Sequence, residues 1–144
     1  MARFTNKVAV VTGAGRGIGL EIARAFAAEG GKVAVVSRSA GSCGSAADAI
    51  NADYPDSAKS YAVDVSDHEA VQALGKEVVA DFGAVNVLVN NAGVTRDGLL
   101  MRMKDEDWDT VLDTNLKGAF NTVKAFQRSM MKAEDPRIIN ISSV

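Results

Sequence analysis

The sequence has 144 residues, of which 47% are hydrophobic and 24% charged, a composition typical of one globular domain with enough apolar surface to form a core. The formal net charge of -2 argues against general electrostatic attraction to nucleic acid or to an anionic membrane. The single cysteine cannot form a disulfide within the chain, and the single histidine has no metal-ligand cluster around it. With no signal-peptide pattern and no apolar run of bilayer length, we expect a cytoplasmic protein with no membrane association and no metal site.

Residues 8–21 read VAVVTGAGRGIGLE, an apolar run that leads directly into a glycine-dense turn. Ile18, Ile22 and Phe26 then follow at helical spacing, so a buried strand feeds a helix. Bare N–H groups at the start of that helix, together with its positive dipole end, favour an anion such as a diphosphate. The spacing is T-G-x-x-x-G-x-G and not the strict G-x-G-x-x-G, so a purely structural glycine turn is the alternative.

The remaining chain alternates short apolar runs with amphipathic segments. After a strand at residues 7–12 and a helix at 16–29, we expect strands at 32–37, 60–63, 85–89 and 137–141. Helices are expected from about residue 44 to 51, from a Ser66–Glu69 capping box to Phe82, and over residues 105–131. This alternation predicts an α/β fold with a Rossmann-like, doubly wound parallel sheet.

The last expected strand, residues 137–141, is followed by only three residues and therefore has no covering helix. Folded domains avoid an uncovered apolar edge of this kind. We therefore expect residues 1–144 to be a single nucleotide-binding domain that is incomplete at its C-terminal side.

An ordered set of motifs runs through the chain: Thr12-Gly13-x-x-x-Gly17-x-Gly19, then Asp64-Val65, the NNAG sequence of residues 90–93, Asn115 in a long helix, and Ser143 after a strand. This set resembles the short-chain dehydrogenase/reductase family over essentially the whole chain. Residues 94–104, VTRDGLLMRMK, are similar to the ketoreductases of that family that reduce 3-oxoacyl groups on acyl-carrier protein in fatty-acid biosynthesis. Alternatives are another ketoreductase, such as one acting on acetoacetyl-CoA, and a truncated nucleotide-binding module without activity.

The resemblance implies an NADP(H) site. The cofactor diphosphate and adenosine ribose would lie against the glycine turn, Asp64 and Val65 would flank the adenine, and the strand end at residues 91–93 would line the nicotinamide side. No acid follows the second strand; Arg16 and Arg38 instead offer guanidinium groups to a 2'-phosphate, which favours NADPH over NADH. Both arginines could also be merely solvated, and Asp64 could be a strand-end cap. The full cofactor set is Thr12, Gly13, Ala14, Gly15, Arg16, Gly17, Ile18, Gly19, Arg38, Asp64, Val65, Asn91, Ala92 and Gly93.

The family delivers a proton to a carbonyl through an Asn, Ser, Tyr and Lys set while hydride arrives from the nicotinamide. The resemblance places Ser143 at the substrate oxygen, with Ser142 as the runner-up because strand alternation should turn its side chain away. It also places Asn115 in the proton relay, although a helix-interior asparagine can simply satisfy a neighbouring backbone group. The tyrosine and lysine would follow Ser143 beyond residue 144, and Tyr54 and Tyr61 do not match them.

The helix expected at residues 105–131 has more apolar residues than one contact with the sheet would use. We expect part of it to form an interface in a homo-oligomer, which the family resemblance makes a homotetramer. The residues expected to contribute are Phe120, Val123, Phe126, Met130 and Met131.

Overall fold

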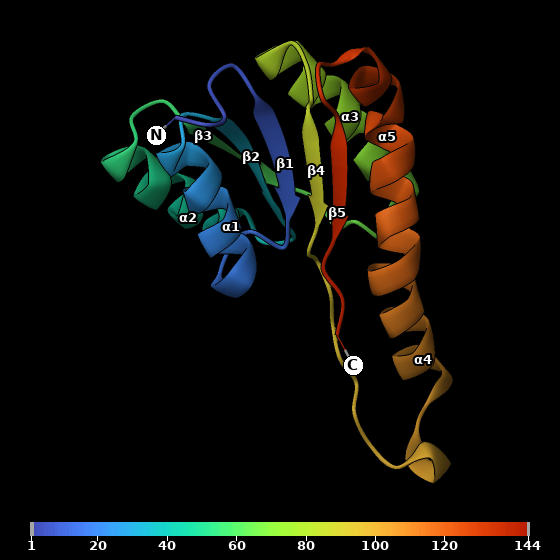
Figure 1. The fold of residues 1–144 in the computed structure, drawn as a ribbon. Helices are drawn as coiled ribbons and strands as arrows, with labels where there is room; N and C mark the ends of the chain where they lie inside the picture. Colours follow the sequence, from blue (N-terminus) through green and yellow to red (C-terminus); the bar gives the residue numbers. More distant parts are fainter. Residues whose placement is uncertain (1, 144) are drawn as a thin grey trace.

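A five-stranded parallel sheet with the order β3-β2-β1-β4-β5 forms the centre of the protein in a computed structural model, which describes residues 2–143 (Figure 1). Every neighbouring pair of strands is parallel, and Val10 in β1 lies opposite both Ala34 in β2 and Leu88 in β4. The expected Rossmann-like fold is thereby confirmed. The strands are β1 Val8–Thr12, β2 Lys32–Ser37, β3 Ala58–Ala62, β4 Val87–Asn90 and β5 Arg137–Asn140.

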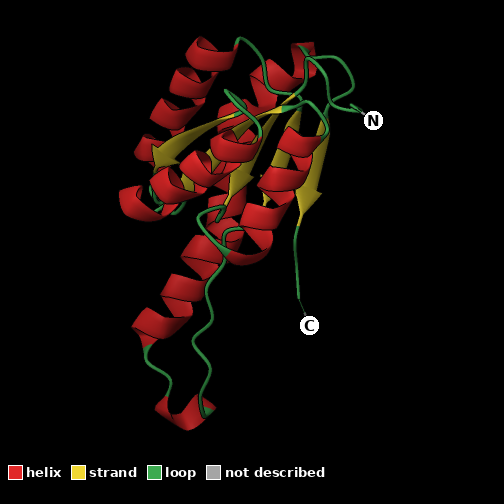
Figure 2. Cartoon of the chain, turned by 90° about the vertical axis from the view of Figure 1, so that its left-hand side faces the viewer, coloured by secondary structure: helices red, strands yellow, loops and turns green. Residues whose placement is uncertain are grey.

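Helices cover both faces of the sheet (Figure 2). Because side chains alternate along β1, Ala9 and Val11 join a core with α1 and α2, whereas Val10 joins a second core with α3 and α5. The helices are α1 Gly17–Ala28, α2 Ala40–Asp53, α3 His68–Phe82, α4 Asp105–Val111 and α5 Gly118–Lys132, with a 3₁₀ turn at Leu100–Arg102 and a π-helical segment at Leu112–Lys117.

Two helix starts differ from the sequence prediction. α2 begins at Ala40, before the expected residue 44, because the Ser39 hydroxyl accepts a hydrogen bond from the Ser42 N–H. α3 is capped by Asp67, whose carboxylate accepts from the Ala70 N–H, and not by Ser66. Ser66 instead donates its backbone N–H and its hydroxyl to the Asp64 carboxylate. The expected Ser66–Glu69 capping box was therefore wrong.

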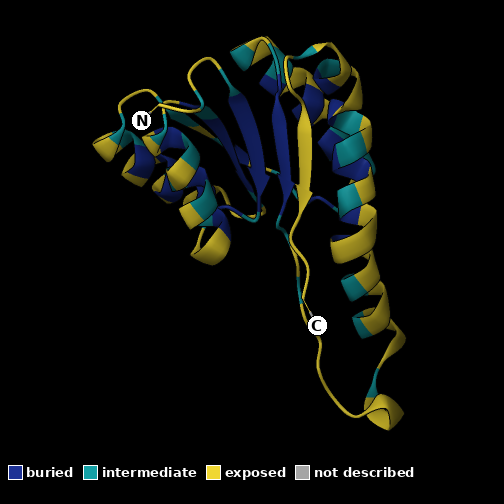
Figure 3. Ribbon diagram, viewed as in Figure 1, coloured by how far each residue is buried: buried dark blue, intermediate teal, exposed yellow. Residues whose placement is uncertain are grey.

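The edge strand β5 is exposed along its whole length, in contrast to the buried strands β1, β2 and β4 (Figure 3). Ile138 and Ile139 keep 45% and 43% of their surface in contact with solvent. The sequence predicted this feature, an apolar edge strand that no helix covers, for residues 137–141.

The expected helix over residues 105–131 is present as α4, the π-helical segment and α5, which follow one another without a break in the chain. Phe126 and Met130 are buried against the sheet and Val123 packs against the same core, so these three residues do not form a second apolar face, contrary to the expectation. Phe120 and Met131 are 60% and 76% exposed and do lie on such a face, which Trp108 and Leu116 extend. The oligomeric state stays a prediction.

The segment between β4 and α4 extends away from the body of the molecule (Figure 2). Leu99, Leu100 and Met101 near its tip are exposed, and Met101 keeps 97% of its surface. Within residues 2–143, no helix is long and apolar enough to cross a bilayer, and no group of three or more His, Cys, Asp or Glu side chains is arranged to hold a metal ion.

Candidate functional site

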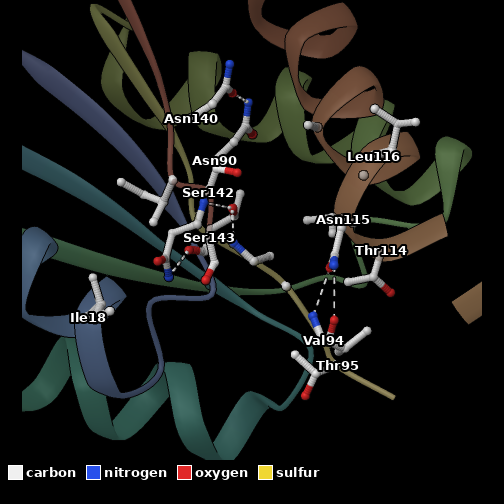
Figure 4. Close-up of a pocket in the computed structure, with 18 of the residues that line it drawn as sticks. Ile18, Asn90, Val94, Thr95, Thr114, Asn115, Leu116, Asn140, Ser142 and Ser143 are labelled. Carbon is white, nitrogen blue, oxygen red and sulfur yellow. Dashed lines mark hydrogen bonds between the residues drawn. The ribbon is translucent and has the colours of Figure 1, made fainter. Parts of the chain in front are cut away.

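A cavity of about 970 Å³ opens where β1, β4 and β5 end (Figure 4). In a parallel sheet the carboxyl ends of all strands meet at one edge, and ligands bind there at the point where strand order reverses. Here the chain crosses from β3 on one side of the sheet to β4 on the other, next to the central β1. The cavity therefore lies where this fold places a nucleotide.

Thr12 and Asn91 join the ends of β1 and β4. The buried Thr12 hydroxyl oxygen accepts hydrogen bonds from the backbone N–H groups of Asn91 and Ala92, each at 3.0 Å. In return, the Asn91 side-chain amide donates to the backbone carbonyls of Thr12 and Gly13, each at 3.2 Å. Four hydrogen bonds thus hold the glycine turn against the NNAG strand end, across about eighty residues of sequence.

The glycine turn needs at least two of its glycines. Gly13 has φ 61°, in the left-handed region, and a Cβ there would lie 2.9 Å from the Cα of Ala92. A Cβ at Gly19 would collide with the backbone carbonyl of Gly13, so this glycine allows α1 to close on β1. Arg16 precedes α1 without capping it through its side chain, and the first turn contains no acid. The N–H groups at this helix start therefore fit a diphosphate.

Asn115 lies in the π-helical segment, where the helix accommodates an extra residue in its turn. Its Oδ1 accepts from the Val94 N–H at 2.8 Å, and its Nδ2 donates to the Val94 carbonyl at 3.0 Å (Figure 4). The side chain thus binds backbone groups of the segment after β4 and not those of its own helix. This contact fixes the cavity wall on the side of residues 93–95, while the expected role of Asn115 in a proton relay stays a prediction.

Ser142 and Ser143 both line the cavity. β5 ends at Asn140, so the alternation of side chains along a strand does not extend to these serines. The expectation that Ser142 points away from the cavity was therefore unsupported. The choice between the two serines rests on the family resemblance, which favours Ser143.

The structure brings most of the expected site residues to one cavity, though not all of them. Thr12, Arg16, Ile18, Val65, Asn91, Ala92, Gly93, Asn115 and Ser143 line it. The other expected residues lie outside the lining: Gly13, Ala14, Gly15, Gly17 and Gly19 shape the turn behind it, Asp64 caps the loop before α3, and Arg38 is exposed just after β2. A role for Asp64 as a local cap, the alternative considered from the sequence, is observed.

Neither tyrosine contributes to the cavity lining. The Tyr61 hydroxyl donates to the Asp81 carboxylate at 2.7 Å, and burial raises the pKa of Tyr61 well above its usual range. Lys59 also donates to Asp81 at 2.7 Å, and its hydrogen bond is the main cause of the lowered pKa of that carboxyl. The hydrogen bonds among these three side chains lie away from the cavity.

Several lining residues escaped the sequence analysis, among them Thr114, Gly118 and Asn140. Gly118 could have been found, because a glycine inside a long apolar helix indicates close packing; a Cβ there would lie 2.7 Å from the Val65 side chain. Asn140 had no local signal, since its side chain meets Asn90 only through the pairing of β4 with β5.

A family model described as short chain dehydrogenase matches residues 7–144. The chain is 44% identical, over 141 residues, to the 3-oxoacyl-[acyl-carrier-protein] reductase FabG of Escherichia coli strain K12, which covers 98% of this chain and 56% of the relative. It is 49% identical to the FabG protein of Staphylococcus aureus strain Mu50, with 96% of this chain and 56% of the relative covered. The chain thus spans about half the length of the curated relatives it matches.

Solved structures are also similar to this chain. A metagenomic short-chain oxidoreductase in complex with NADP superimposes with a TM-score of 0.91 and 39% identity, covering 98% of this chain and 64% of that one. An NAD⁺-bound xylitol dehydrogenase superimposes with a TM-score of 0.90 and 35% identity, covering 96% and 53% respectively.

Proposed function

Since this chain belongs to the short-chain dehydrogenase family, we propose that the whole protein reduces 3-oxoacyl-[acyl-carrier-protein] to the 3-hydroxyacyl form with NADPH. The observation that carries the proposal is that one cavity brings together Arg16 and Ile18 beside the glycine turn, the NNAG strand end, Asn115 and Ser143. The family contains oxidoreductases, and the identity of 44% and 49% to two reductases of this specificity supports the substrate. The pathway is then fatty-acid biosynthesis, with acyl-carrier protein as partner.

The residues of this chain bind and orient the reactants in the proposed reaction. The start of α1 and the turn before it hold the diphosphate, Val65 and Gly118 shape the wall between α5 and the β3 end, and residues 91–93 line the nicotinamide side. The cofactor, when bound, supplies the hydride. Ser143 donates a hydrogen bond to the substrate oxygen as negative charge develops there, and this bond is stronger in the transition state than in the ground state.

NADPH is favoured over NADH in this proposal. Arg16 lines the cavity beside the glycine turn, and Arg38 follows the end of β2, where an NAD-binding relative would carry an acid. Both guanidinium groups are exposed and can pair with a 2'-phosphate dianion. The NADP complex of the metagenomic relative, at 39% identity, is consistent with this choice.

The proton donor of the proposed reaction is a tyrosine that follows Ser143 in the family pattern, since Tyr54 and Tyr61 lie away from the cavity. Residues 1–144 are accordingly proposed as one cofactor-binding domain that does not reduce the substrate without the segment that contains this tyrosine. The whole protein is proposed to be a cytoplasmic homotetramer in which the exposed face of α4, the π-helical segment and α5, containing Trp108, Leu116 and Phe120, packs on a second copy.

The test is NADPH oxidation, followed by absorbance, with acetoacetyl groups on acyl-carrier protein and on coenzyme A. We expect the whole protein to turn over the carrier-protein substrate with the higher kcat/KM. A preference for the coenzyme A substrate would identify the protein as an acetoacetyl-CoA reductase. NADPH binding without any turnover would identify a nucleotide-binding module without activity.

A further inference from the structure

A second groove, of about 800 Å³, runs between α3 and α5 and shares no lining residue with the cavity at the strand ends. The two helices lie side by side on the same face of the sheet (Figure 1). They approach closely at Gly75, where a Cβ would lie 2.9 Å from the carbonyl oxygen of Ala125. More than half of the lining residues are glycine, alanine or serine, and the volume falls within the range of small-molecule sites.

Four cationic side chains line this groove: Lys76 on α3, and Lys124, Arg128 and Lys132 on α5. The three on α5 are spaced four residues apart, so they lie on one helix face a turn apart, where like charges destabilise a helix. The whole chain carries 18 acidic and 16 basic residues, yet none of the six ion pairs within residues 2–143 includes any of the four. The positive charge of the groove is therefore local and has no carboxylate partner, although Lys124 lies over the Phe120 ring at 5.9 Å from its centroid.

The groove also contains an unsatisfied hydrogen-bond donor. The Gln72 side-chain nitrogen, one helix turn before Lys76, is buried and has no hydrogen-bond partner within the described part of the chain. A buried N–H without an acceptor costs free energy, and such groups are rare in folded proteins. An acceptor atom supplied by a ligand would remove that cost once the Gln72 side chain turns toward the groove.

Helix ends do not account for this arrangement. Lys132 lies in the last turn of α5, where a cation interacts favourably with the helix dipole. Lys76 and Lys124 lie near the middle of their helices, at the level of the close contact between Gly75 and Ala125. The helix dipole therefore explains neither lysine, although Lys124 also contacts the Phe120 ring.

We propose that the groove between α3 and α5 binds a compact polyanion bearing phosphate or carboxylate groups, separately from the cofactor. Lys76, Lys124 and Arg128 supply charge-assisted hydrogen bonds from both walls, and the Gln72 amide donates after its side chain turns toward the groove. The small lining residues leave room for the anion between the helices. This site does not depend on the proposed reductase activity.

The experiment is calorimetric titration of the protein with inorganic tripolyphosphate and, separately, with citrate, both without and with saturating NADPH. We expect binding of one probe or both, unaffected by NADPH. Lys76→Ala and Lys124→Ala should each weaken binding about tenfold or more, as expected for a lost charged contact. The matched control, Lys117→Ala, removes a cation just before α5 that does not line the groove and should bind like the wild type.

Gln72 gives the sharper pair of variants. Gln72→Glu is nearly isosteric but adds a negative charge, so it should abolish binding; Gln72→Leu removes the unpartnered amide, so it should weaken binding while raising Tm. Circular dichroism of each variant serves as the control for folding. Binding to Gln72→Glu as tight as to the wild type would overturn the proposal, as would loss of binding when NADPH is added, or no binding of either probe.

Discussion

Replacing Thr12 by valine tests the joint between the glycine turn and the NNAG strand end. Valine has nearly the shape of threonine but no acceptor, so the N–H groups of Asn91 and Ala92 both lose their partner. An unsatisfied buried donor costs about 1–3 kcal/mol. Because Asn91 and Ala92 are only half-buried, water reaches them in part, and we take the lower half of that range for each. The expected loss in the free energy of unfolding is then about 2–4 kcal/mol, a large share of the typical total of about 5–15 kcal/mol.

Urea denaturation followed by circular dichroism measures this loss through the shift of the midpoint. The control is Thr12→Ser, which keeps the hydroxyl and removes one buried methyl group, and it should cost only about 1 kcal/mol. If Thr12→Val cost no more than Thr12→Ser, the hydroxyl would not hold the two strand ends together and the reasoning would be refuted.

Three further outcomes are expected. Arg38→Ala should weaken NADPH binding by about 1.5–3 kcal/mol and leave NADH binding nearly unchanged in calorimetric titration, and equal losses would reject the assignment. Hydrogen bonds from Lys59 and Tyr61 lower the pKa of Asp81, so they stabilise the fold fully above the ordinary aspartate pKa of about 3.9, and this stabilisation is lost as the pH falls through the lowered pKa. Asp81→Asn should therefore show a smaller drop in Tm over that acid range than the wild type. A drop in Tm equal to that of the wild type would contradict this. Leu116→Glu, on the exposed helix face, should dissociate the proposed tetramer in sedimentation velocity, and an intact tetramer would count against that interface.

The sequence predicted the sheet and its helices because apolar periodicity is a local signal. The five strands appear within three residues of their expected bounds, and β2 appears with the expected bounds. Capping was harder to predict, since Ser66 and Asp67 are adjacent and both suit a helix start. Only the folded loop shows that Ser66 bonds to Asp64, which leaves Asp67 to cap α3.

The candidate site was predictable as a list of residues but not as a geometry. The glycine turn and the NNAG sequence are separate motifs about eighty residues apart, and nothing local indicates that Thr12 accepts hydrogen bonds from both Asn91 and Ala92. Similarly, a helical hydrophobic pattern does not reveal the extra residue in the π-helical turn at Asn115. That turn places the Asn115 side chain against Val94, a contact between distant segments that depends on the packing of α5.

Comparison of Ser143→Ala with Ser142→Ala in the whole protein tests the central claim most directly. Steady-state turnover of acetoacetyl-acyl-carrier protein is measured for both variants, together with the Kd for NADPH. Loss of a donor that acts on the developing oxyanion should lower kcat by roughly 10²- to 10³-fold for Ser143→Ala while the Kd changes little. Ser142→Ala, which alters the adjacent side chain in the same cavity, should lose much less. A larger loss of kcat for Ser142→Ala, or a loss in Ser143→Ala that lies mainly in NADPH affinity, would contradict the proposed site.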